Sequence, residues 1–409
     1  MAVPYTSANP IIYDNDEVLD VYTDDYLMSL ASLGEIDLRG LITSSPISPH
    51  DPYVLSADYD RMHTQRLESV AAARASDMVN ILDPILGVEG HLVVPGSGNI
   101  DDTVPIGSPG STLIIAEALA ASPSVPLVFV GGGPLTTVAD AYLQNPSIAA
   151  NLIVAWIGGI ATSPYTMSDY NGWADGWAGR IVAERLRFVI FPGVTAMVPD
   201  VPRTQLTTLP DCALRTFMLT KELNTDTNRP NDHDADGPPA VAIKSAAYIT
   251  SQVQVRYAGM SMTTWAPVNY NVPYFTADAS GNVTVITGVN VTAGSAEWWR
   301  ALGAALETAY NVSLTNYFRW SYTHVAGPYP TEYRVYYGSS PGVYAGYTAV
   351  PYGTNQVLVG SVVPGPGTYY SKIYAWNAAY TTFASSSEVK LIVTGLSAPL
   401  GDIQLTLTI

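Results

Sequence analysis

Several carboxylates follow the first apolar segment of the chain at close spacing. The run Ile11-Ile12-Tyr13 leads directly into Asp14-Asn15-Asp16, and Asp20, Asp24 and Asp25 follow. Like charges this close repel one another, and burial would raise their pKa values. A hard cation with oxygen ligands would relieve the repulsion, and Ca²⁺ or Mg²⁺ is the usual choice in proteins. The alternative is a solvated acidic loop in which Asp24 caps the helix that follows.

The elements that must position these acids alternate between strands and helices over residues 9–310. This alternation predicts an α/β domain with a mostly parallel sheet and flanking helices. Ligands of such sheets bind at the carboxyl ends of the strands, which is where the acids lie. The predicted strands are 10–13, 38–43, 92–95, 127–131, 152–157 and 188–191, and the predicted helices are 25–33, 65–82, 111–121, 136–144, 174–184 and 295–310.

The pattern changes near residue 312. The following residues form short alternating segments, separated by turns rich in Gly, Pro and Ser, at 333–337, 356–362, 368–376, 388–393 and 402–409. Strands with this spacing are typical of a β-sandwich. The sequence therefore predicts an α/β domain over residues 1–312 and an all-β sandwich, with a last strand at the C-terminus, over residues 313–409.

Five segments, taken in order, resemble the inosine–uridine-preferring nucleoside hydrolase family. That family opens with a strand followed by D-x-D-P-G-x-D-D, and this chain has Asp14-Asn15-Asp16 and then Asp24-Asp25. The resemblance spans residues 10–310 and implies the family's α/β fold. The other matching segments are LVFVGGGPLTTVADAY (127–142), Asn145-Pro146 with VAWIGG (154–159), SDYNGWADGWA (168–178) and HDADGPPAVA (233–242).

The resemblance implies hydrolysis of the N-glycosidic bond of nucleosides with one bound Ca²⁺. The ribosyl C1′ gains oxocarbenium character in such a cleavage, as in other glycoside hydrolyses. A metal lowers the pKa of its bound water, and a carboxylate takes the proton. By position, the resemblance implies that Asp16 is both general base and metal ligand. It implies that Asp25 and the Gly132 carbonyl are further ligands.

The same resemblance assigns the remaining site residues. It implies that Asp24, Asp169 and Asn171 bind the ribose, and that His233 is the acid for the leaving base. Two alternatives stay open for the distal metal ligand: Asp234 completes the family's His-Asp pair, whereas Asp236 lies nearer the expected distance from Ala240.

The chain also departs from the family pattern. The Pro-Gly pair is absent, and residues 17–23 separate Asp16 from Asp24 by more than the family's spacing. Ser44-Ser45-Pro46 stands where the family has Gly-Asn, and Asp169 is one methylene shorter than the family's Glu. These departures predict an altered loop around the expected ligands.

Composition excludes several classes of protein. The 409 residues carry 35 acids against 18 bases, a formal charge of −17, which argues against a nucleic-acid partner. The single cysteine, Cys212, excludes a disulfide framework and a cysteine zinc cluster. No apolar run reaches the ~18 residues of a membrane span. No signal-peptide pattern is visible, and the Tyr-rich, Lys-poor composition suits a virion or extracellular surface as well as the cytoplasm, so localisation stays unknown.

Residues 313–395 resemble a fibronectin type III domain. Trp320 stands at the position of the core tryptophan, 333–338 resembles the third strand, and Tyr369 resembles the tyrosine corner. The resemblance implies a spacer or adhesion module without chemistry of its own.

Two hypotheses follow. The first is Ca²⁺-dependent hydrolysis of ribonucleosides, or of a related N-riboside, in which water activated by Asp16 attacks C1′. The second is a structural or adhesive protein of a virion or surface assembly that keeps the fold but has lost the site. The expected partners are a nucleoside or other riboside, and further copies of the chain in a homo-oligomer or larger assembly. Convergence of Asp16, Asp25 and Asp234 or Asp236 to about 2.3–2.6 Å from one cation would favour the enzyme.

Overall fold

The computed structural model describes residues 3–16, 22–45, 56–192, 200–210, 212–222, 231–245, 247–265, 268–306, 309–323, 330–340, 342–376, 382–386, 388–394 and 403–408. The chain divides into two units, Met1–Leu306 and Glu307–Ile409. The sequence placed its boundary at residue 312, just beyond this division.

The first unit is built on one large sheet. Within the described residues ten strands join it, in the order β3-β2-β1-β4-β5-β7-β12-β10-β11-β6. The strands from β3 to β12 in this order are parallel, and β10, β11 and β6 add an antiparallel extension. The strands are β1 (Pro10–Asn15), β2 (Asp37–Thr43), β3 (Ile85–Leu86), β4 (Leu127–Gly131), β5 (Leu152–Ile157), β6 (Tyr165–Thr166), β7 (Arg187–Phe191), β10 (Ile249–Trp265), β11 (Val268–Ala277) and β12 (Val283–Val289).

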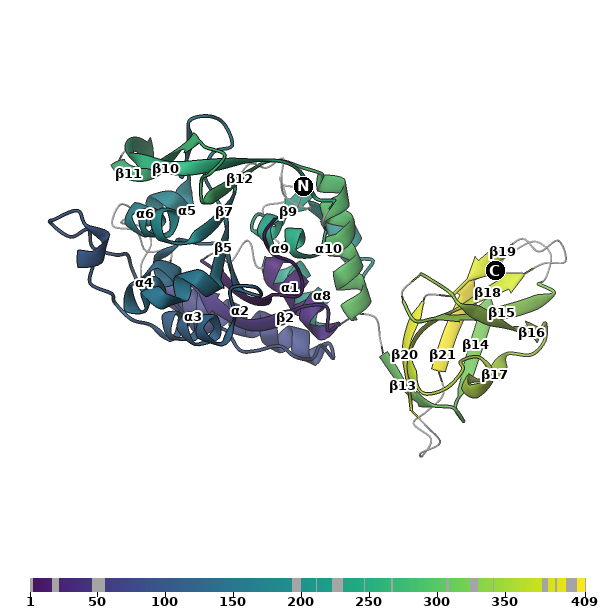
Figure 1. Ribbon diagram of the computed structural model, residues 1–409. Coiled ribbons are helices and arrows are strands. Elements are labelled where there is room, and N and C mark those ends of the chain that lie inside the picture. The colour runs from purple at the N-terminus through teal and green to yellow at the C-terminus, as the bar shows by residue number, and fades with distance from the viewer. Residues whose placement is uncertain are drawn as a thin grey trace. The chain divides into compact units, whose positions relative to one another are not determined.

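Helices cover both faces of this sheet, which explains why its parallel strands are almost continuously apolar. Successive side chains of a strand point to opposite faces, so Ile11 and Tyr13 enter one core and Ile12 enters the other. Figure 1 shows one layer of helices on each side of the strands. The first layer contains α1 (Tyr22–Ser32), α2 (Ser56–Ala75), α9 (Gly237–Lys244) and α10 (Val291–Leu306), and the second contains α3 (Pro109–Ala120), α4 (Thr136–Gln144) and α6 (Gly176–Arg185).

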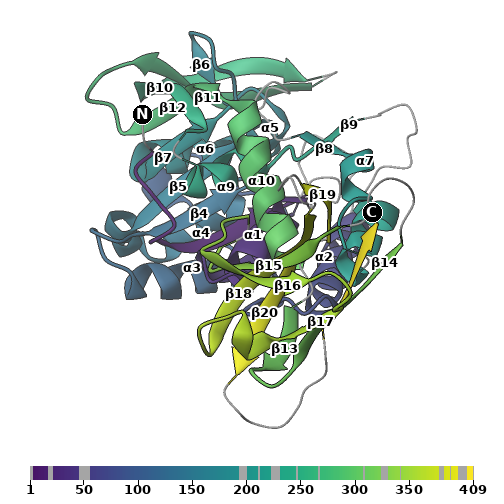
Figure 2. The ribbon, with the colours of Figure 1, turned by 90° about the vertical axis from the view of Figure 1, so that its right-hand side faces the viewer.

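The predicted alternation of strands and helices is confirmed, but several elements differ. The predicted helix 65–82 corresponds to α2 at Ser56–Ala75, and β12 has no counterpart among the predicted strands. Residues 92–95 form a loop and not a strand, and Val93 and Val94 are 72% and 55% exposed. The predicted helix 174–184 is divided at Asp175 into α5 (Tyr170–Ala174) and α6. The long hairpin of β10 and β11, which Figure 2 shows beside β6 beyond β12, has no counterpart among the predicted elements.

Shorter elements complete the first unit. They are η1 (Ile100–Asp102), η2 (Pro146–Asn151), β8 (Asp200–Pro202), α7 (Arg203–Leu206), α8 (Ala213–Phe217), η3 (Met218–Glu222) and β9 (Asn231–His233). Among the described helices, none combines the length and the apolar character needed to cross a membrane.

The second unit is all β. Its larger sheet has the order β13-β20-β18-β15-β16 with β19 paired to β18, and its smaller sheet has the order β17-β14-β21. Phe318, Trp320, Tyr333 and Ile373 are buried in a core of its own. The elements are β13 (Ala309–Ser313), β14 (Tyr317–Thr323), β15 (Glu332–Gly338), β16 (Gly346–Pro351), β17 (Gln356–Leu358), η4 (Val359–Ser361), β18 (Gly367–Trp376), β19 (Thr382–Ser385), β20 (Val389–Thr394) and β21 (Ile403–Thr408).

Candidate functional site

The carboxyl ends of the central parallel strands meet at one edge of the sheet. The turn after β4 is tied to β1 because Gly132 N donates to Asp14 O at 2.7 Å. The turn after β2 is tied to the same strand because Ser44 N donates to Asn15 O at 2.9 Å. Backbone pairing therefore brings the acids at the end of β1 next to the turns that follow β2 and β4.

A glycine turn forms the centre of this edge. A Cβ atom on Gly132 would overlap the Asp236 carboxylate, and one on Gly133 would lie 2.8 Å from Asp16 Cβ. The Gly132 carbonyl accepts a hydrogen bond from Asn171 Nδ2 at 2.7 Å. Asp16, Asn171 and Asp236 thus surround the Gly132-Gly133 turn, and we call these five residues the glycine-turn group.

Asp236, and not Asp234, is the acid that lies against this turn. Asp236 Oδ2 accepts a hydrogen bond from the Tyr13 hydroxyl at 3.2 Å. Asp234 turns to the helices, where one oxygen accepts from the Thr23 hydroxyl and the other accepts from Trp298 Nε1 at 3.0 Å. Burial raises the pKa of Asp234 to about 7, against the lowering effect of these two donors.

Asp169 and Asn171 flank the ends of β4 and β5 through the short helix α5. The Asp169 carboxylate caps this helix by accepting from Gly172 N at 2.9 Å, and it also accepts from Gly159 N at 2.7 Å. Burial raises the pKa of Asp169 to about 7, although both N–H donors favour the ionised form. Each of its two oxygens therefore accepts one hydrogen bond from the backbone.

Asp24 forms a buried ion pair with Arg66 of α2. Arg66 Nε donates to Asp24 Oδ2 at 2.8 Å and Nη2 donates to Oδ1 at 2.6 Å, which is the strong bidentate geometry. The side chains are 2% and 1% exposed. The predicted ribose contact of Asp24 stays a prediction.

The other two acids near β1 are also buried. Asp14 Oδ1 accepts from the Ser44 hydroxyl, whereas no described group donates to Asp14 Oδ2. Burial raises the pKa of Asp14 well above its usual value, and Arg66 lowers it. Asp25 Oδ1 accepts from the Ser69 hydroxyl at 3.2 Å.

Among the described residues, the predicted acids do not all converge on one point. Within the part of the chain that the structure describes, no three His, Cys, Asp or Glu side chains lie in an arrangement that could hold a metal ion. His233 pairs through its backbone with Asp200, and Asp20, in 17–21, lies outside the described residues. Asp16 and Asp236 share the glycine turn, but Asp25 and Asp234 are bonded elsewhere.

Sequence reasoning overlooked Arg66, the basic residue at the centre of these acids. A signal for it exists, because Arg66 shares a helical face with Ser69, Val70 and Ala73, all of which are buried. A basic residue inside an apolar stripe of a helix requires a buried acidic partner. Asp24 supplies it.

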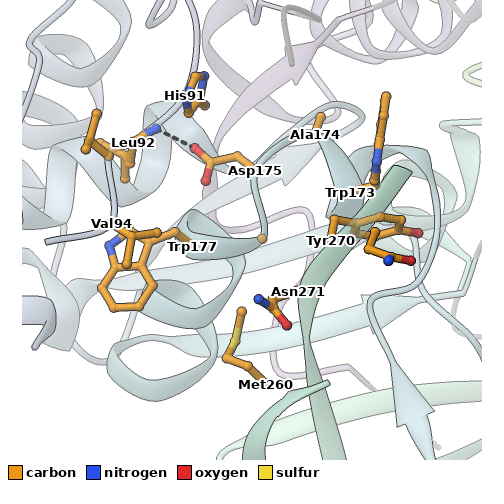
Figure 3. Close-up of a pocket in the computed structure, with 13 residues that line it drawn as sticks. His91, Leu92, Val94, Trp173, Ala174, Asp175, Trp177, Met260, Tyr270 and Asn271 are labelled. Carbon is orange, nitrogen blue, oxygen red and sulfur yellow. Dashed lines mark hydrogen bonds between the residues drawn. The ribbon is translucent and has the colours of Figure 1, made fainter. Parts of the chain in front are cut away.

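A cavity of about 610 Å³ lies beside the site, on the other side of α5. Trp173 lines it, and on a helix Trp173 points about 200° away from Asn171. Figure 3 shows Trp173 and Tyr270 on one side and Val94 and Trp177 on the other. The Asp175 carboxylate at its margin accepts hydrogen bonds from Leu92 N, Thr136 Oγ1 and Ala178 N, each at 2.9 Å.

Comparisons with known proteins support the fold. No protein-family model matches the sequence, and no curated protein matches it. The structure is similar to the purine-preferring ribonucleoside hydrolase from Gardnerella vaginalis, with a TM-score of 0.50 and 16% sequence identity. The match covers 73% of this chain and 99% of that chain. It is similar to an inosine-guanosine nucleoside hydrolase at 16% identity and the same coverages, with a TM-score of 0.51.

The α/β unit has a nucleoside hydrolase-like fold. At 16% identity this likeness is one of fold alone. Both matched chains are covered almost completely, whereas 73% of this chain is covered.

Proposed function

We propose that the α/β unit is an N-riboside hydrolase related to the inosine–uridine-preferring family. The observation that carries this proposal is the glycine-turn group. It gathers the acid directly after β1, an amide from α5 and a second acid at the start of α9, at the carboxyl edge of a nucleoside hydrolase-like sheet. Ligands of parallel α/β sheets bind at this edge.

In this proposal Asp16 is the general base. It removes a proton from the water that attacks C1′, while the glycosidic bond breaks through an oxocarbenium-like transition state. Asn171 and Asp169 orient the ribose, and His233 protonates the leaving base. A bound Ca²⁺ would supply Lewis-acid activation of water, but the described acids do not form a ligand set for it.

Ribose release from purine and pyrimidine nucleosides tests the proposal. Wild type is compared with Asp16→Asn, with and without added Ca²⁺, and Asp60→Asn on the exposed side of α2 is the matched control. We expect release by wild type and by Asp60→Asn, and a loss of at least about 100-fold in Asp16→Asn, as for removal of a general base. Absence of release from every nucleoside by wild type would contradict the proposal.

A second candidate function is favoured by the buried partners of Asp24 and Asp234. Because their carboxylates are satisfied within the protein, the fold could serve as the body of a structural or adhesive component of a virion or surface assembly. The second unit would then be a fibronectin type III-like adhesion module. Light scattering at increasing protein concentration tests this candidate. An assembly protein should self-associate, and a protein that stays monomeric at every concentration would contradict it.

A further inference from the structure

Arg66 lies where several buried oxygens of the sheet edge meet. Its guanidinium donates to both oxygens of Asp24 and to the carbonyl of Ile42, and it lies 5.4 Å from the centre of the Tyr13 ring. Asp14 is close enough for its charge to raise the pKa of Arg66, and Asp24 raises it more. Burial alone would lower that pKa, but these acids outweigh it, so the guanidinium stays charged.

These oxygens are of the kind that a hard divalent cation would bind. They comprise the two carboxylate oxygens of Asp24 and the Ile42 carbonyl, with the nearby Asp14 carboxylate, whose Oδ2 is buried without a donor among the described residues. Carboxylate and carbonyl oxygens are the ligands of Ca²⁺. A planar guanidinium with five donors satisfies the same kind of group and is always charged.

We propose that the Arg66 guanidinium is the built-in cation of this cluster of Asp14, Asp24 and the Ile42 carbonyl, so that the α/β unit folds without a bound divalent cation. It follows that Asp24 has a structural role in the fold. This inference goes beyond the proposed function, because it concerns which group neutralises the acids and holds equally for an enzyme and for an assembly protein.

The inference predicts that removal of Arg66 exchanges an internal cation for an external one. Arg66→Gln leaves the Asp24 carboxylate buried beside Asp14 without a counter-charge, and Ca²⁺ can then take the vacated position. Asp24→Asn removes the acid instead, so it leaves no such position. The double variant Arg66→Gln/Asp24→Asn removes both charges and likewise has no reason to bind Ca²⁺.

Thermal unfolding with excess Ca²⁺ and with excess chelator tests the proposal on the full-length chain. We expect equal melting temperatures in both conditions for wild type, Asp24→Asn and the double variant. For Arg66→Gln we expect a lower melting temperature in chelator and an increase on addition of Ca²⁺. Arg74→Met, an exposed arginine of the same helix paired with Asp83, is the matched control and should behave as wild type.

Two results would overturn the inference. One is a wild-type melting temperature that rises with Ca²⁺ and falls with chelator. The other is an Arg66→Gln variant that does not respond to Ca²⁺. If Arg66→Gln does not fold in chelator, recovery of folded protein on refolding with Ca²⁺ supports the inference, and failure to recover contradicts it. Because the measurement is thermal, its outcome is independent of ribose release.

Discussion

At the scale of single residues, the structure separates two acids that the sequence could not distinguish. Asp236 lies against Gly132, whereas Asp234 faces Trp298 and Thr23. The sequence shows two acids on either side of Ala235, and only their surroundings decide which one reaches the sheet edge. The His-Asp pair that favoured Asp234 is a local pattern, while the contact of Asp236 depends on β4, which is distant in the chain.

Gly132 gives the sharpest test at this scale. Gly132→Ala places a methyl group where the Asp236 carboxylate lies, so the acid must move away from the turn. We expect a loss of about 1–3 kcal/mol in the free energy of unfolding, as for overpacking of a close contact. Gly303→Ala in α10, where an added Cβ meets nothing within 4 Å, should be neutral or stabilising. Urea denaturation measures both, and equal stabilities would contradict the close approach of Asp236.

Asp169 gives a prediction about pH. Its folded-state pKa of about 7 lies above its usual value of 3.8. Between pH 3.8 and pH 7, the folded protein therefore holds a proton on Asp169 that the unfolded chain has released. The resulting stabilisation is complete below pH 3.8 and is lost as the pH rises through 7. Between pH 8 and pH 6 the free energy of unfolding should therefore increase by about 1 kcal/mol on account of Asp169, after a discount for its partial exposure.

The variant Asp169→Asn isolates that contribution. Asparagine can still cap α5, but it does not titrate, so the variant should lose this part of the pH dependence. Asp234, with a pKa of about 7, adds a pH dependence of the same sign to wild type and to Asp169→Asn. The contribution of Asp169 is therefore the difference in pH dependence between wild type and the variant. Chemical denaturation at pH 6 and pH 8 measures it. An equal pH dependence in both proteins would show that Asp169 does not titrate in this range.

At the scale of elements, the Asp175 carboxylate connects three segments. It caps α6 through Ala178 N, holds the loop at Leu92, and accepts from Thr136 at the start of α4. Asp175→Ala leaves these buried donors without their acceptor, and each such group costs about 1–3 kcal/mol. We expect Asp175→Ala to lower the free energy of unfolding by roughly 3 kcal/mol or more. The control Asp101→Ala should leave it nearly unchanged, because the ion pair of Asp101 with Arg185 is exposed. A difference below about 1 kcal/mol would contradict this role.

The elements that the sequence predicted correctly are those whose pattern is local. The ranges 127–131, 136–144 and 152–157 agree with β4, α4 and β5, because a short apolar run or a helical face identifies each one. The division of the predicted helix 174–184 at Asp175 depends on the contacts of Asp175 with Leu92 and Thr136, which are distant in the chain. Residues 92–95 were wrongly predicted as a strand, because an apolar run alone does not show whether a neighbouring strand exists. The hairpin of β10 and β11 escaped prediction.

The same reasoning explains what could be predicted of the site. The family resemblance implied that Asp16 and the Gly132 carbonyl lie in one site, and the structure brings Asp16 against the Gly132-Gly133 turn. The sequence could not show that Arg66, from α2, neutralises Asp24, since that pairing joins residues 42 positions apart. The helical stripe around Arg66 indicates that this residue is buried, but not which acid it pairs with.

At the scale of the whole molecule, the two units have separate hydrophobic cores. The second unit's core, which contains Ile373, shares no buried residue with the two cores that cover the first unit's sheet, one of which contains Ile190. Stability then depends on two independent sets of contacts, and calorimetry should resolve two unfolding transitions. Ile373→Ala should lower only one of them, because removing buried methyl groups costs about 2–5 kcal/mol in the core that loses them. Ile190→Ala should lower only the other. If either variant shifted both transitions equally, the two cores would unfold as one cooperative unit, and the division between Leu306 and Glu307 would not be a thermodynamic boundary.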